Sequence, residues 1–132
     1  MKKRFLIAAV CIAYVLAWNA VSSSQPARIQ KAQRSFARNR AEMTAMAQRF
    51  AAGERAALNA AGLRGVQRVA VHADPAWLEF QTDALGIVSS SVYYGVYYSP
   101  TDEPMQPDMG GGDNRWHTQR IYENWYYYEA SF

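Results

Sequence analysis

The run that most restricts how this chain can fold lies at residues 91–98, where valines and tyrosines surround a single glycine. β-branched and aromatic residues favour strands, and successive strand side chains point to opposite faces. Tyr93, Gly95 and Tyr97 therefore share one face, and the opposite face is equally apolar. Both faces need cover, so the run is predicted to be a central strand. Residues 121–132 are the other stretch of this character, and we expect the two to pair.

Length and charge limit the number of domains and the classes of partner that this chain can have. A chain of 132 residues with net charge +3 has room for one domain plus accessory segments. Basic residues concentrate before residue 66 and acidic residues after it, so the folded C-terminal part is acidic and a nucleic-acid partner is not expected. Cys11 is the single cysteine, which excludes an intrachain disulfide.

The N-terminus carries a targeting signal: Lys2, Lys3 and Arg4 precede an apolar run over residues 5–21. We expect residues 1–21 to stay attached as a single-pass signal-anchor, a transmembrane helix in contact with membrane lipid, with the C-terminal domain outside the cytoplasm. The alternative is a signal segment that is cleaved after Ser22, since Ala20, Val21 and Ser22 form a weak small-x-small site, and the protein is then secreted.

Residues 22–65 are predicted to form a basic amphipathic helix, with one continuous helix over about residues 27–61. Apolar residues recur at seven-residue intervals along it: Ile29, Phe36, Met43, Phe50 and Ala57. Such a helix is longer than a small domain needs, so its first half is expected to be a stalk and its second half to pack on the sheet. A homodimer through this stripe is an alternative.

Residues 66–132 are predicted to form a tyrosine-rich antiparallel β domain. Residues 66–73 and 77–82 alternate as strands on either side of an Asp74-Pro75 turn, residues 99–115 form an acidic loop, and residues 117–132 form the last strand. The predicted fold is therefore α+β: a membrane helix, a long helix, and a four-stranded antiparallel meander, cystatin-like by analogy.

Catalytic and metal signatures are weak. His72 and His117 are the only histidines, so a metal site would have to combine them with Asp74 or Asp113. The further paired ligands that a zinc site needs are missing. The acidic loop does not have the spacing of a calcium-binding EF-hand. The serines at 89–91 lack a nucleophile elbow. We predict no catalytic residues, no metal, no cofactor and no enzymatic activity, with a small metal-dependent hydrolase as the least favoured option.

Tyrosine is the strongest compositional signal, with nine in the chain. Rings filling a small two-sided sheet explain most of them. The functional interpretation is an aromatic surface on the sheet face without the helix, formed by Tyr93, Tyr97, Trp125 and Tyr127, which contacts a protein or glycan partner.

Residues 86–100 (GIVSSSVYYGVYYSP) and 124–132 (NWYYYEASF) resemble the C-terminal signature of small bacterial membrane-anchored or exported proteins whose function is not known. The resemblance implies attachment to a membrane or export and brings no catalytic residue. Together these features predict a membrane-tethered interaction or sensing module. The alternative is a secreted binding or inhibitor protein.

Overall fold

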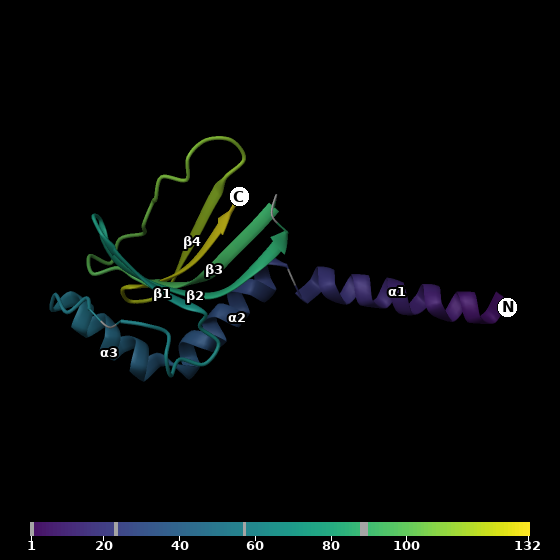
Figure 1. Ribbon diagram of the computed structural model, residues 1–132, viewed down its shortest axis with the longest axis horizontal. Coiled ribbons are helices and arrows are strands. Elements are labelled where there is room, and N and C mark those ends of the chain that lie inside the picture. Colours follow the sequence, from purple (N-terminus) through teal and green to yellow (C-terminus); the bar gives the residue numbers. More distant parts are fainter. Residues whose placement is uncertain (1, 23, 57, 88–89) are drawn as a thin grey trace.

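A computed structural model describes residues 2–22, 24–56, 58–87 and 90–132 (Figure 1). Within these residues, three helices precede a five-stranded antiparallel sheet, so the fold is of the α+β class. The helices are α1 (Lys2–Ser22), α2 (Gln25–Arg38) and α3 (Arg40–Ala51). The strands are β1 (Arg68–Ala73), β2 (Ala76–Ile87), β3 (Ser90–Tyr98), β4 (Arg115–Tyr122) and β5 (Trp125–Ser131).

The central strand lies where the sequence predicts it. β3 is hydrogen-bonded to β2 on one side and to β5 on the other, which confirms the pairing of the two tyrosine-rich runs. In the register with β5, Gly95 lies opposite Tyr128 and Tyr97 opposite Tyr126. The β1–β2 hairpin around Asp74 and Pro75 is also as expected.

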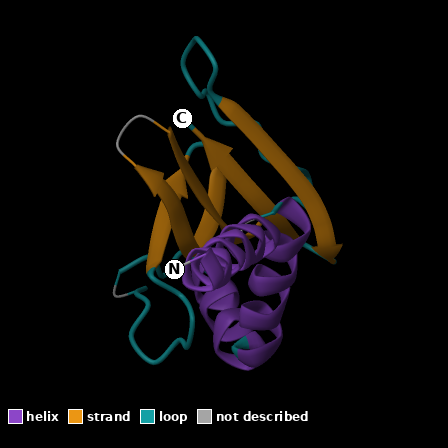
Figure 2. Ribbon diagram, turned by 90° about the vertical axis from the view of Figure 1, so that its right-hand side faces the viewer, coloured by secondary structure: helices purple, strands orange, loops and turns teal. Residues whose placement is uncertain are grey.

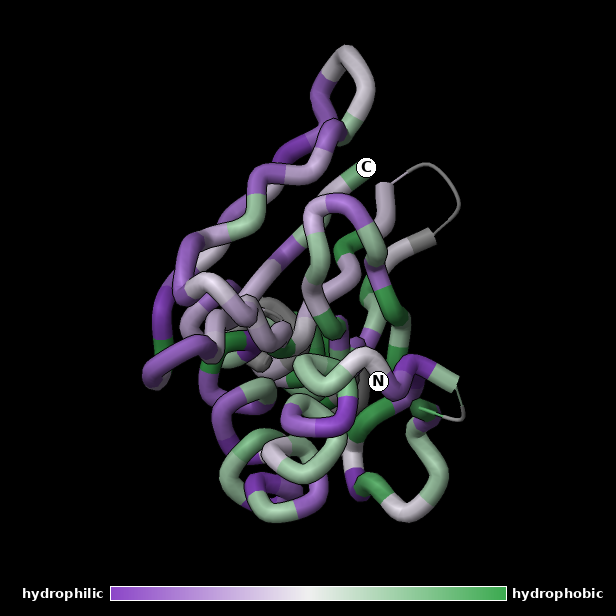
Figure 3. Tube along the Cα trace, turned by 90° about the vertical axis from the view of Figure 1, so that its left-hand side faces the viewer, coloured by the Kyte–Doolittle hydropathy of each residue, from purple (hydrophilic) through white to green (hydrophobic). Residues whose placement is uncertain are grey.

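The predicted four-stranded meander is wrong, because residues 117–132 form two strands instead of one. β4 and β5 are joined by a tight turn in which Asn124 adopts a positive φ of 66°, a conformation that asparagine tolerates better than most residues. The sheet order is β1-β2-β3-β5-β4. The segment 99–114 carries the chain from β3 to β4 at the outer edge of the sheet, and β5 then lies between β3 and β4. Figure 3 shows the segment 99–114 as a largely hydrophilic trace.

The prediction of one continuous helix is also wrong, because the helix is interrupted at Asn39, between α2 and α3. The Asn39 side chain is buried and donates to the carbonyl oxygens of Ser35 and Arg64 at 2.8 and 2.7 Å, while its own oxygen accepts from the Arg64 backbone N–H at 2.9 Å. These bonds hold the returning segment 60–66 against the helix break. Past α3, the chain enters a loop that places Leu63 and Val66 in the core.

The apolar stripe itself is confirmed where the structure describes it, and Ala57 lies outside the described residues. Ala32, Phe36, Met43, Ala47 and Phe50 are all buried against the sheet or the returning loop. The first half is therefore packed, which corrects the predicted stalk; Figure 2 shows the helices gathered on one side of the sheet.

An ion pair fixes α2 on the sheet. The guanidinium of Arg28 donates to the Glu129 carboxylate of β5 at 2.8 Å, and both side chains are largely buried. Tyr127 adds a hydroxyl bond of 2.7 Å to the same carboxylate. Burial raises the pKa of Glu129, but the bonds from Arg28 and Tyr127 lower it by more, so its pKa lies below the ordinary value.

The prediction of a single-pass membrane helix is also wrong. Within the described part of the chain, no helix combines the length and the apolar character that crossing a bilayer requires. The transmembrane and signal-anchor interpretations are therefore dropped.

Candidate functional site

The sheet face opposite the helices carries a second cluster of aromatic side chains. Strand alternation gives this face Trp77 from β2, Tyr97 from β3, and Tyr126 and Tyr128 from β5, all buried. Trp116 of β4 stacks on Tyr128 with ring centroids 5.2 Å apart. The sheet therefore has packed side chains on both faces, and the aromatic side chains on the face opposite the helices surround a pocket.

Part of the long connection forms one wall of that pocket. The backbone N–H of Met105 donates to the Tyr97 hydroxyl at 2.9 Å, and the indole N–H of Trp116 donates to the Met105 carbonyl at 2.8 Å. Thr118 shares a further bond of 2.7 Å with the Tyr97 hydroxyl. These bonds explain how a segment rich in proline and glycine lies in a defined place over the sheet.

The resulting pocket has a volume of about 380 Å³, within the range of small-molecule sites. Its described lining comes from all five strands and from the connection between β3 and β4: Arg68, His72, Trp77, Glu79, Gln81, Tyr93, Pro107, Met109, Trp116, Tyr128, Ala130 and Phe132. We call it the Glu79 pocket, because that carboxylate is its most buried charge.

Glu79 is held by three neighbours. Its side chain is 9% exposed, the Tyr128 hydroxyl donates to Oε1 at 2.6 Å, and His72 Nε2 lies 2.8 Å from Oε2. The Arg68 guanidinium approaches Oε1 to 3.6 Å from the exposed edge of the sheet. The carboxylate is thus fixed in position at the base of the pocket.

The electrostatics keep Glu79 ionised. Burial raises the pKa of its carboxyl, but the hydrogen bonds from His72 and Tyr128 lower it by more, so the pKa lies below the ordinary 4.5. Burial and the adjacent negative charge raise the pKa of Tyr128 well above its usual range. At neutral pH the pair is therefore a phenol donating to a carboxylate.

The imidazole of His72 is held by stacking as well as by Glu79. Its ring lies parallel to Trp77 at a centroid distance of 3.9 Å and an interplanar angle of 7°. Its side chain remains 37% exposed, so one edge of the ring is available to a molecule in the pocket. His72 is thus a fixed polar group on the pocket wall.

The four residues of the predicted aromatic surface do not lie together. Tyr93 is exposed and lines the Glu79 pocket, while Tyr97 lies beneath the same face, fully buried. Trp125 and Tyr127 are buried on the helix side, because Tyr97 pairs with Tyr126 and alternation then sends Trp125 and Tyr127 to the other face. The β5 residues on the Tyr93 face are Tyr126 and Tyr128 instead.

Sequence reasoning missed Glu79 as a site residue, although one signal was present. Trp77, Glu79 and Gln81 alternate along β2, which places a carboxylate beside a tryptophan on one face. His72 was considered only as a metal ligand. In the described residues there is no group of three or more His, Cys, Asp or Glu side chains able to hold a metal, and Ser89 lies outside those residues.

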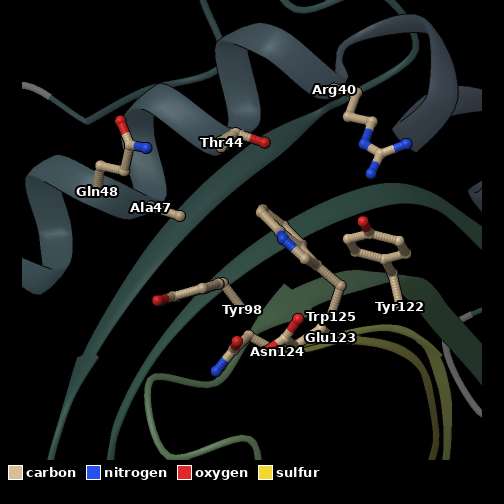
Figure 4. A pocket seen from close by; sticks show the side chains of 9 residues that line it. All are labelled: Arg40, Thr44, Ala47, Gln48, Tyr98, Tyr122, Glu123, Asn124 and Trp125. Atoms are coloured by element: carbon tan, nitrogen blue, oxygen red, sulfur yellow. The ribbon is translucent and has the colours of Figure 1, made fainter.

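A second pocket, of about 330 Å³, lies between α3 and the β4–β5 turn (Figure 4). Its described lining is Arg40, Thr44, Ala47, Gln48, Tyr98, Tyr122, Glu123, Asn124 and Trp125. We call it the α3 cleft. It lies on the helix side of the sheet, so the two pockets are separated by the sheet itself.

In comparisons with known proteins, no protein-family model, curated protein or solved structure matches this chain. The resemblance to small bacterial membrane-anchored or exported proteins therefore stays a prediction. What the chain does has to be argued from the two pockets.

Proposed function

We propose that this chain is an exported binding protein whose Glu79 pocket takes a neutral, hydroxyl-rich ligand of the saccharide class. The observation that carries this proposal is the ionised, buried carboxylate of Glu79 at the base of an aromatic-lined pocket. A buried charge is costly unless it is hydrogen-bonded, and a ligand hydroxyl can add a further charge-assisted bond.

The lining matches the two kinds of surface that a sugar presents. Trp116 and Tyr93 offer partly exposed rings to the apolar face of a sugar ring, while Gln81 and His72 offer polar groups to its hydroxyls. Arg68 lies near enough to Glu79 for their charges to offset each other, so the pocket has little bias towards an ionic ligand.

Binding fits the lining better than hydrolysis does. Among the described residues that line the pocket, Glu79 is the one with a carboxylate side chain. Glycoside hydrolysis in most families uses two carboxyl groups on either side of the scissile bond. Glu79 also accepts bonds from Tyr128 and His72, which suits a fixed acceptor.

Export is supported by the N-terminal segment. The apolar run over residues 5–21 follows three basic residues and ends at the small-x-small site of residues 20–22, which is the order of a secretory signal peptide. In Figure 1, α1 projects away from the sheet, and its large apolar side chains are exposed, including Ile7, Leu16 and Trp18. Cleavage after Ser22 would remove them and release the domain, the secreted form of the protein.

A titration tests the ligand class. The protein is kept in a polyoxyethylene detergent, which carries no sugar, and neutral mono- and disaccharides are added while tryptophan fluorescence is recorded. At least one saccharide should bind saturably, and Glu79→Gln should weaken it at least tenfold, since a hydrogen bond to a charged group contributes about 1.5–3 kcal/mol. Glu123→Gln, at an exposed position, is the control.

Two results would overturn the proposal. One is a panel in which no saccharide binds; the other is equal binding by Glu79→Gln. Saturable binding of an alkylammonium ion in place of any saccharide would show that the carboxylate selects cations. Intact mass of the protein from an exporting host tests the release step: loss of residues 1–22 is expected, and a full-length mass in the membrane fraction would contradict it.

A further inference from the structure

We infer that the α3 cleft is a second binding site, for an organic monocarboxylate, and that Arg40 is its anchor. The inference does not rest on the Glu79 pocket, which lies on the other face of the sheet. It rests on one exposed guanidinium that a ring holds in place, on polar groups in line with it, and on an apolar base.

The cleft lies along α3, the helix that follows the break at Asn39. α3 begins at Arg40 and runs past the β4–β5 turn, from which Tyr122, Glu123 and Asn124 contribute to the cleft lining. Figure 4 shows Arg40 and Tyr122 side by side at one end of the cleft, with Thr44 and Gln48 further along the helix. Residues four apart lie on one helix face, so Arg40, Thr44 and Gln48 form one polar row along the wall.

Arg40 is placed to bind an anion. Its guanidinium lies over the Tyr122 ring, 4.3 Å from the centroid, and stacking leaves the N–H groups at its edge accessible. Within the described residues, no carboxylate lies within ion-pair distance of it, Glu123 included. A planar guanidinium of this kind takes a carboxylate through two parallel hydrogen bonds.

The rest of the cleft sets the size and charge of the ligand. Ala47 and Trp125 form an apolar base with Tyr98 beside it, which suits an aliphatic or aromatic tail. A volume of about 330 Å³ holds a small organic acid or the last residue of a peptide. Glu123 on the rim repels a second negative charge, so the cleft favours a monocarboxylate over a dicarboxylate.

Calorimetry of the full chain, in the same detergent, tests this site with matched probes. Octanoate and benzoate should bind saturably, while octanamide and benzamide, which have the same shape without the charge, should bind at least tenfold more weakly. Arg40→Gln should reduce octanoate binding at least tenfold and Arg40→Lys less, because lysine keeps the charge but loses the planar fork. Arg38→Gln, an exposed arginine outside the cleft lining, should leave binding unchanged.

A second pair of probes identifies the source of the carboxylate. Acetyl-Ala-Ala-Phe with a free C-terminus is compared with its amide; tighter binding than octanoate, lost in the amide, identifies a peptide terminus, and weaker binding identifies a free acid. The inference is overturned if the amides bind as well as the acids, or if folded Arg40→Gln binds octanoate like the parent. Thermal melts confirm that each variant is folded.

Discussion

The hydroxyl of Tyr128 donates a 2.6 Å hydrogen bond to the carboxylate of Glu79, joining β5 to β2 across the central strand. The bond spans β3 on the face where Gly95, opposite Tyr128, has no side chain. The glycine, the tyrosine and the carboxylate thus depend on one another, and each can be tested separately.

Replacing Glu79 by glutamine should destabilise the fold by about 1–3 kcal/mol at pH 7, because a buried charge-assisted network is lost. The pKa of Glu79 is lower in the folded protein than its ordinary value of 4.5, so the ionised carboxylate stabilises the fold at pH values above 4.5. This stabilisation is lost as the pH falls through the folded-state pKa. Urea melts should therefore show the gap between parent and Glu79→Gln narrowing below about pH 4.5. A gap that is constant down to pH 3 would contradict the assignment.

Tyr128→Phe removes the hydroxyl while keeping the ring against Trp116. We expect a loss of about 1–2 kcal/mol in the free energy of unfolding and a rise in the pKa of Glu79, because one donor to the buried carboxylate is gone. The pKa is measured by NMR titration of the Glu79 carboxyl carbon. Tyr122→Phe, at an exposed ring, is the matched control and should change neither quantity.

Gly95→Val should also destabilise the domain, by at least about 1–3 kcal/mol, although valine has the higher strand propensity. A Cβ at this position would lie 2.1 Å from the carbonyl oxygen of Phe80, where β2 carries an irregularity in its pairing between Gln81 and Asp83. Gly111→Ala, where nothing lies within 4 Å, is the control. A Gly95→Val melting temperature equal to or above that of the parent would show that β2 can move away.

Asn39→Ala should cost about 2–4 kcal/mol, since it leaves the Arg64 backbone groups without the bonds that bridge the helix break. Asn39→Asp keeps the acceptor for the Arg64 N–H but loses the donors, so it should lie between alanine and the parent. Chemical denaturation measures the series, with exposed Gln33→Ala as the control. Equal stability of all three proteins would mean that the break is set by something other than this side chain.

The parts of the fold that could be predicted are those specified by neighbouring residues. Alternation located β1, the start of β2 and β3, and the seven-residue spacing identified the buried stripe of the helices. The turn at Asn124 also has a local sequence signal, because asparagine tolerates a positive φ. The aromatic residues on either side of it nevertheless predict one continuous strand.

What could not be predicted depends on partners distant in the chain. The helix ends at Asn39 because that side chain pairs with Arg64, 25 positions later. Glu79 becomes a site residue only because Tyr128, 49 positions away, lies above it. Placing Trp125 and Tyr127 on the helix side of the sheet required the register of β3 with β5, because a shift of one residue moves every side chain to the opposite face.

The most direct test of the central claim, that the Glu79 pocket is the ligand site, is an NMR titration of the tryptophan indole N–H signals with the saccharide that binds in the fluorescence panel. Trp77 and Trp116 line that pocket, Trp125 lines the α3 cleft, and Trp18 is on α1. The account predicts that the Trp77 and Trp116 signals shift together and saturate, while those of Trp125 and Trp18 stay in place. Shifts confined to Trp125, or no shift at Trp77 and Trp116 at saturating ligand, would contradict it.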